Sequence, residues 1–168
     1  VFSSEGFFAS IRKFFVKKLY KQAFSHPSQV IIFQNEDDKN LILTLHKSLK
    51  AKAILIAGSG VDIKLFKDNQ KKSDIPIIML VSRMLSDKGV YDFVSAVKIL
   101  QKSDGSLKEK CRFVLVGGTD LSNPAKIKES ELSDWAKSGI VEFWGHISNI
   151  PPILSKAYVV VLPSYREG

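Results

Sequence analysis

The sequence predicts an α/β protein built on doubly wound parallel sheets, and three observations support that prediction. Short apolar runs recur along the chain without strict alternation of apolar and polar residues, as in strands that are covered on both faces. Segments with helical periodicity separate these runs, as parallel βαβ units require. The composition, with 45% apolar and 25% charged residues among 168, is that of a globular protein and excludes a disordered or collagen-like chain.

The cysteine content and the start of the chain narrow the class of protein further. One cysteine leaves no disulfide framework and no cysteine-based zinc site, and it is typical of a reducing compartment. The apolar runs are far shorter than the roughly 20 residues that cross a bilayer. The chain opens on Val1 and Phe2 without the pattern of a signal peptide, so we expect a piece of a longer protein.

The first predicted helix is apolar on one face and basic on the other. Its apolar face comprises Phe7, Ile11, Phe14, Phe15 and Leu19, and its basic row comprises Lys13, Lys17 and Lys21. Half of the net charge of +8 lies within the first 35 residues. The lysine row is either a solvated helix face or a surface that docks on anionic lipid, and we expect the aromatic residues to pack mainly into the core.

A strand, a helix and a second strand follow. The β-branched and aromatic run 30–33 predicts a buried strand. Acidic residues at 36–38 suit the positive N-terminal end of a helix. The run 53–57 predicts the second strand, and the polar stretch 64–74, which has little periodicity, predicts a linker or surface loop.

A regular alternation begins after this stretch. The predicted strands are 77–81, 113–116, 140–144 and 158–162, and the predicted helices are 90–100, 125–137 and 150–157. In a doubly wound sheet, ligands bind outside the carboxyl ends of the strands. The residues that follow each predicted strand are therefore candidates for a binding site.

Cations, glycines and one acid follow these strands. Arg83 and Lys88 come after the first strand and just before a helix, and two cations beside a helix N-terminus suit a phosphate or diphosphate. Glycines after the later strands, Gly117 and Gly118 among them, let a ligand approach the backbone. Glu167 follows the last strand and can accept hydrogen bonds from sugar or ribose hydroxyls. Together they predict a site for a nucleotide that carries a polyol.

Other phosphate sites and metal sites lack the necessary residues. The string that begins at Gly58 starts like a dinucleotide fingerprint but places Ile63 where the third glycine is required. No Gly-x4-Gly-Lys-Ser/Thr string occurs, which excludes a P-loop. His26 and His46 have no partner at metal-ligand spacing, so we expect no metal site.

Four strings occur in order along most of the chain: AGSGVDIKLF, IIMLVSRMLSDKGVYDFVSAVKIL, FVLVGG and VEFWGHISNIPPILSKAYVVVLPSYREG. Their order and spacing resemble the donor-nucleotide half of retaining glycosyltransferase family 4, which has the GT-B architecture of two Rossmann-like domains facing a cleft. Upstream, VIIFQNEDDKNLIL is similar to the end of the N-terminal domain in bacterial members that build capsule or O-antigen repeat units. The resemblance implies the end of an acceptor-side domain at 1–58, a linker at 59–75 and the first part of a nucleotide-sugar-binding domain at 76–168.

The resemblance also implies roles for the charged residues. Arg83 and Lys88 would hold the donor diphosphate. Glu167 matches the first Glu of the family's Glu-x7-Glu signature, which contacts the donor sugar, and it is the candidate catalytic residue; an ordinary loop acid is the alternative interpretation. The chain ends at Gly168, before the second Glu of that signature. We therefore expect turnover in the full-length parent and not in this fragment alone.

Four uncharged or weakly charged positions complete the implied nucleotide-sugar site. By resemblance, Gly117 and Gly118 lie beside the nucleotide, His146 lies near the base and Gly60 lines the interdomain cleft. Each has a structural alternative. The glycines are also explained by turn geometry, and His146 by a surface or packing role.

The activity implied by the resemblance is transfer of a sugar from a nucleotide diphosphate sugar to an acceptor hydroxyl, with retention at the anomeric carbon. UDP is the favoured nucleotide, while GDP and ADP stay open. The two cations and the helix termini would stabilise the leaving diphosphate, so we expect neither a metal nor a cofactor. The expected acceptor is a glycan or a lipid-linked glycan of cell-surface polysaccharide synthesis, and the expected location is cytoplasmic, peripheral on the inner face of the membrane.

A basic Rossmann-like module that binds nucleic acid without enzymatic activity is the alternative function. Against it, the aromatic residues do not interleave with basic ones, and acids nearly balance the cations outside the first 35 residues. We therefore expect no nucleic-acid partner.

Overall fold

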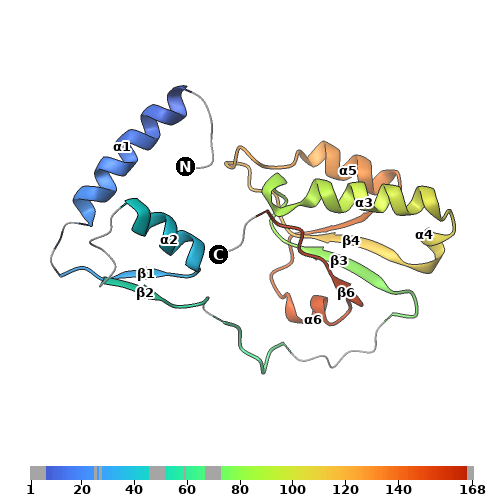
Figure 1. Cartoon of the computed structure of the whole chain (residues 1–168). Coiled ribbons are helices and arrows are strands. Elements are labelled where there is room, and N and C mark those ends of the chain that lie inside the picture. The colour runs from blue at the N-terminus through green and yellow to red at the C-terminus, as the bar shows by residue number, and fades with distance from the viewer. Residues whose placement is uncertain are drawn as a thin grey trace. The chain divides into compact units, whose positions relative to one another are not determined.

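The computed structural model describes residues 7–24, 26, 28–45, 52–58, 60–66 and 73–165. These residues fall into two compact units, one that ends at Gly60 and one that begins at Val61 (Figure 1). Each unit contains a parallel sheet and helices, which confirms the predicted α/β class.

The N-terminal unit is small. It comprises α1 (Phe7–Ala23), β1 (Ile31–Phe33), α2 (Glu36–Leu45) and β2 (Ala53–Leu55). The two strands pair in parallel, with Ile31 opposite Ala53. The acidic first turn of α2 is confirmed, and Asn35 accepts a hydrogen bond from the backbone N–H of Asp38 at 2.7 Å, which caps that helix.

Burial in the N-terminal unit is lower than the sequence predicts. Of the strand predicted to be buried, Phe33 is 7% exposed but Ile32 is 60% exposed, and on α1 the rings of Phe14 and Phe15 are 66% and 58% exposed. Of the described helices, α2 is in contact with both strands. The expected packing of the aromatic residues into the core is therefore not found in the described residues. No helix among them is both long and apolar enough to span a membrane.

The C-terminal unit carries a four-stranded parallel sheet in the order β5-β4-β3-β6. Its elements are β3 (Ile77–Val81), η2 (Ser86–Lys88), α3 (Val90–Ser103), α4 (Leu107–Lys110), β4 (Arg112–Val116), α5 (Glu129–Lys137), β5 (Glu142–Gly145), α6 (Pro151–Leu154) and β6 (Val159–Val160). Helices α3 and α5 lie on one face of the sheet and α6 on the other (Figure 1). This is the predicted doubly wound arrangement.

Two cores lie on the two faces of this sheet. Leu80 and Leu115 pack with residues of α3 and α5 in one core, while Met79 and Val114 belong to the other core with Ala157. Because successive side chains of a strand point to opposite faces, β3 and β4 are buried on both, as their unbroken apolar runs predict. For β6 that prediction is wrong: Val159 and Val160 are 44% and 50% exposed, so the described residues cover neither face of this edge strand fully.

One helix starts later than expected. The sequence predicts a helix from Ala125, whereas α5 begins at Glu129. The intervening residues are held in other contacts: the side chain of Asn123 accepts from the N–H of Ala125 at 2.9 Å, and the N–H of buried Ile127 donates to Met84 O at 3.0 Å. These bonds satisfy the backbone outside a helix. The short helix α4 is not predicted from the sequence.

The expected linker lacks helix and strand where the structure describes it, at residues 60–66 and 73–76. Residues 67–72 lie outside the described part of the chain. The domain boundaries at 58, 59, 75 and 76 stay predictions.

Candidate functional site

The carboxyl ends of β3, β4 and β5 are joined by backbone hydrogen bonds beyond the strands themselves. The N–H of Ser82 donates to Val116 O at 3.0 Å, and that of Met84 donates to Gly118 O at 3.0 Å. The N–H of Gly117 donates to Gly145 O at 2.8 Å. Three turns far apart in the sequence therefore form one continuous edge.

The two glycines after β4, Gly117 and Gly118, differ in the contacts that surround them. Gly117 has a φ of +145°, and a Cβ there would overlap with the carbonyl oxygen of Ser82, so the backbone of the β3 turn itself requires a glycine. A Cβ at Gly118 would lie 3.3 Å from Cβ of His146. Gly118 and His146 are thus direct neighbours, and the turn interpretation accounts for Gly117.

Two adjoining depressions lie along this edge. The first, of about 580 Å³, is lined by Arg83, Gly118, Asp120, Ser122 and His146 among others. The second, of about 660 Å³, is lined by residues of α5 and β5, including Glu129, Ser133 and Phe143. Both share Gly118, Thr119 and His146, so they are continuous at the ends of β4 and β5.

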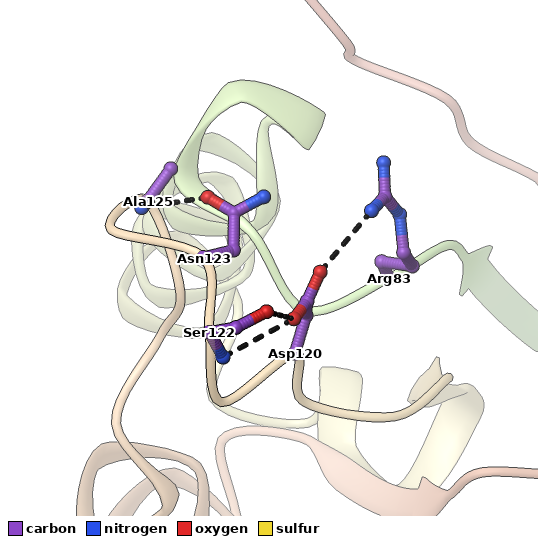
Figure 2. Close-up of polar contacts among 5 residues, drawn as sticks. All are labelled: Arg83, Asp120, Ser122, Asn123 and Ala125. Carbon is purple, nitrogen blue, oxygen red and sulfur yellow. Dashed lines mark hydrogen bonds and ion pairs between the residues drawn. The ribbon is translucent and has the colours of Figure 1, made fainter.

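Arg83 is held by an acid that the sequence did not single out. Its Nη1 lies 3.3 Å from Asp120 Oδ2, and the two side chains are 61% and 32% exposed (Figure 2). Ser122 donates to Asp120 Oδ1 from its hydroxyl at 2.8 Å and from its N–H at 3.3 Å. One carboxylate oxygen is thus fixed by Ser122 and the other faces Arg83, whose second terminal nitrogen points away from Asp120 (Figure 2).

The ionisation of Asp120 follows from these contacts. The hydrogen bond from Ser122 and, to a smaller extent, the charge of Arg83 hold the pKa of Asp120 below its usual value. The site therefore contains an anion beside its cation at neutral pH. A short Asp-x-Ser string, which favours a local side-chain turn, is the signal that points to Asp120 and Ser122 in the sequence.

Lys88 lies at the same edge of the sheet but not in the depression that Arg83 lines. It ends η2, and Gly89, with a φ of +69°, connects η2 to α3. A Cβ at Gly89 would overlap with the carbonyl oxygen of Pro163. The turn after β6 is therefore seated against the start of α3, next to Lys88.

The remaining predicted residues are placed only in part. Gly60 belongs to the N-terminal unit and has a φ of +69°, which a turn explains. Glu167 lies outside the described residues, and its role stays a prediction. Within the described part of the chain, no three His, Cys, Asp or Glu side chains gather closely enough to hold a metal ion, and metal independence likewise stays a prediction.

The parallel sheet, its helices on both faces and the glycine turns at its carboxyl edge define a Rossmann-like domain with a ligand site at the ends of its strands. Residues 75–168 match the family described as glycosyl transferases group 1. The chain belongs to that family.

Two curated bacterial relatives are similar over nearly the whole chain. One is the N,N'-diacetylbacillosaminyl-diphospho-undecaprenol alpha-1,3-N-acetylgalactosaminyltransferase of Campylobacter jejuni, 32% identical over 98% of this chain. The other is the capsular polysaccharide biosynthesis glycosyltransferase CapM of Staphylococcus aureus, 24% identical over 93% of this chain. The chain spans 43% of the length of each relative.

A solved structure supports the fold. The glycosyltransferase of Rickettsia africae ESF-5 matches with a TM-score of 0.58 and 21% sequence identity, over 81% of this chain and 38% of that chain. This likeness confirms the predicted Rossmann-like parallel sheets.

Proposed function

We propose that this chain is part of a retaining glycosyltransferase of family 4, which transfers a sugar from a nucleotide diphosphate sugar to an acceptor hydroxyl. The observation that carries the proposal is the position of Arg83 beside the glycine turn at the carboxyl edge of the sheet, where it lines a depression with Gly118 and His146. A fixed cation at such an edge suits a diphosphate. Membership of the glycosyl transferases group 1 family supports sugar transfer as the chemistry.

The two depressions suggest how a nucleotide would lie. The diphosphate would bind at Arg83, with Lys88 contributing from the turn before α3. The nucleoside would extend into the second depression, where Glu129 and Ser133 offer polar atoms to a base or ribose. UDP is the nucleotide we favour. Glu167, two residues beyond the described turn, would contact the sugar.

The chemical contribution of this half of the site is stabilisation of the leaving group. As the bond between the sugar and the diphosphate breaks, negative charge grows on the diphosphate oxygens. That charge would be stabilised by Arg83, Lys88 and the backbone N–H groups at the start of α3. Because these groups are already in position, the reaction would not depend on a reorganisation of solvent around the charge. This mechanism requires neither a metal nor a cofactor.

The relatives suggest the biological setting. One relative's name refers to a diphospho-undecaprenol acceptor and the other's to capsular polysaccharide, so we propose a lipid-linked or cell-surface glycan as the acceptor. Helix α1 exposes Phe14, Phe15 and Leu19, 64% in the case of Leu19, and carries the lysine row. These features support a cytoplasmic enzyme that is peripheral on the inner face of the membrane.

The test is nucleotide binding by the full-length enzyme. Arg83→Ala removes a charge-assisted contact worth about 1.5–3 kcal/mol, so the Kd for UDP should rise by roughly 10- to 100-fold. Lys102→Ala, on an exposed position in the last turn of α3, is the matched control and should leave the Kd unchanged. Salt-dependent binding to generic duplex DNA without binding to UDP, GDP or ADP would instead identify a nucleic-acid module.

A further inference from the structure

The turn that carries Lys88 gains little stability from its own side chains. Lys88 ends the short helix η2, and none of the three side chains of η2 is buried. Apolar burial stabilises a segment in proportion to the area removed from water, so it contributes little here. The backbone N–H of Ser86 donates to Ala125 O at 2.8 Å, which anchors the start of η2. The end of η2, where Lys88 lies, depends on contacts with other parts of the chain.

The turn after β6 supplies such contacts through one residue. The N–H of Tyr165 donates to Asp87 O at 3.0 Å, and its hydroxyl donates to Asp92 Oδ2 at 2.8 Å. Asp87 directly precedes Lys88, and Asp92 lies in the first turn of α3. Tyr165 is therefore bonded to the chain on both sides of Lys88, although 73 residues separate it from Asp92.

A close backbone contact joins the same two turns. Gly89, directly after Lys88, has a φ of +69°, and a Cβ there would overlap with the carbonyl oxygen of Pro163. Tyr165 is 72% exposed, so burial of its ring contributes little to this arrangement. The two hydrogen bonds of Tyr165 and the contact at Gly89 therefore account for how the turn after β6 is seated against the Lys88 turn.

We propose that Tyr165 and Asp92 are positioning residues for Lys88, which hold its turn where the ammonium group can reach the diphosphate of the donor. The inference rests on the proposed function, in which Lys88 contributes to binding the diphosphate. A lysine acts on phosphate as a point charge, so its contribution falls as its distance from the phosphate grows. Loss of the hydrogen bond between Tyr165 and Asp92 should therefore weaken binding of a nucleoside diphosphate.

The role differs from a general role in folding in one measurable respect. A residue that acts through Lys88 loses its effect on binding once the Lys88 ammonium group has been removed. A residue that only stabilises the fold weakens binding by the same factor whether Lys88 is present or not. A double-mutant cycle between Tyr165 and Lys88 distinguishes these two cases.

The experiment is calorimetric titration of the full-length enzyme with whichever of UDP, GDP and ADP the unmodified enzyme binds most tightly. Tyr165→Phe removes the hydroxyl without changing any charge, and it should raise the Kd about threefold, the size expected for one hydrogen bond. Lys88→Ala should raise the Kd about tenfold, because it removes a charge-assisted contact. Adding Tyr165→Phe to Lys88→Ala should change the Kd by less than about 1.5-fold.

Two variants of Asp92 test the other end of the hydrogen bond. Asp92→Asn and Asp92→Ala both remove the negative charge, but only Asp92→Ala also removes the oxygen that accepts from Tyr165. The Kd of Asp92→Ala should therefore be about threefold higher than that of Asp92→Asn, and this difference should vanish when each is combined with Tyr165→Phe.

Tyr91→Phe is the matched control. Tyr91 also belongs to the first turn of α3, and it also donates its hydroxyl to an acid, Glu131, at 3.3 Å. It makes no contact of this kind with the Lys88 turn, so Tyr91→Phe should leave the Kd unchanged.

The outcomes separate this inference from the proposed function. If Arg83→Ala weakens nucleotide binding but Tyr165→Phe binds normally, the positioning role is overturned and the proposed function stands. If Tyr165→Phe weakens binding by the same factor with and without Lys88, the hydrogen bond serves the fold and the positioning role is also overturned. An unmodified enzyme that binds none of the three nucleotides overturns the proposed function itself.

Discussion

Arg83 and Asp120 form the most informative pair at the level of single residues. The position of Arg83 could be predicted because a strand followed by a cation places that cation at the carboxyl edge of a parallel sheet. Its partner lies 37 residues away, and their contact depends on which strand lies next to β3. Strand order follows from tertiary packing, so the sequence pattern alone did not reveal the acid beside the predicted anion site.

The first prediction concerns Asp120→Asn. Removing the negative charge beside the proposed diphosphate site lessens its repulsion of the ligand, so the full-length variant should bind UDP about threefold more tightly at low salt. Asparagine keeps an acceptor for Ser122, and the local turn should survive. Because exposed charges are screened, the gain should shrink in high salt.

Calorimetric titration with UDP at two salt concentrations checks this expectation. Weaker binding of UDP by Asp120→Asn at low salt would contradict this prediction. It would mean that the carboxylate chiefly orients Arg83, because the affinity lost when Arg83 is no longer oriented would exceed the affinity gained from reduced repulsion.

At the level of elements, β4 and β5 are joined by a side-chain network near their amino ends. Arg112 Nε lies 2.6 Å from Glu142 Oε1 and its Nη2 lies 2.7 Å from Oε2, while Trp144 Nε1 donates to Glu142 Oε2 at 3.0 Å. The hydrogen bond from Arg112 is the main reason why the pKa of Glu142 lies below its ordinary value. A two-point hydrogen-bonded ion pair of this kind stabilises the fold more than an isolated surface ion pair does.

The second prediction is a pH-dependent stability difference for Glu142→Gln. The folded state lowers the pKa of Glu142, so its contribution is present above the unfolded value near 4.5 and is lost as the pH falls through the folded value. The side chains of Arg112 and Glu142 are both nearly 40% exposed, so solvent screens their interaction. Glu142→Gln should therefore lower the free energy of unfolding at pH 7 by about 1 kcal/mol.

Thermal unfolding of the full-length protein at several pH values measures this difference. The gap between the unmodified protein and Glu142→Gln should narrow steadily below pH 4.5. A gap that is constant across this range would show that the glutamate contributes through shape and not through charge.

The elements themselves could largely be predicted from the sequence, with failures that have common physical causes. Unbroken apolar runs identified β3 and β4 because both strands are buried on two faces. The same pattern overestimated the burial of β6, which pairs on one side only among the described strands. The helical periodicity also predicted the start of α5 too early. The backbone N–H of buried Ile127 donates to Met84 O outside any helix, and the sequence pattern carries no information about that hydrogen bond.

At the level of the whole molecule, the two units differ in what the sequence could establish. The C-terminal unit follows the regular alternation of strands and helices, and its residues 75–168 match the family. In the N-terminal unit, the prediction of helix α1 is confirmed, but its aromatic side chains are exposed among the described residues. A helical pattern shows which residues share a face and does not show what covers that face.

The third prediction concerns that helix. Each lysine near an anionic surface is worth about 1 kcal/mol, so Lys13, Lys17 and Lys21 together would hold the full-length enzyme weakly on an acidic membrane. Replacing all three by glutamine should reduce binding to anionic vesicles at low salt by at least tenfold. Neutral vesicles should bind both proteins equally.

Sedimentation with anionic and neutral vesicles at low and high salt provides the measurement. Equal binding of the unmodified enzyme to both kinds of vesicle, or binding that survives the three substitutions, would assign the lysine row to a solvated helix face.

The close approach of Gly117 to Ser82 has a consequence for how such a site can change over evolutionary time. Backbone meets backbone at this point with no side chain between them, so the frame of the edge is independent of the side chains that line the depressions. Wall positions such as Thr119 and Ser133 take no part in this backbone contact. If the depressions bind the donor as we propose, a substitution at such a position would change the surface that meets the ligand and leave the Gly117–Ser82 contact in place.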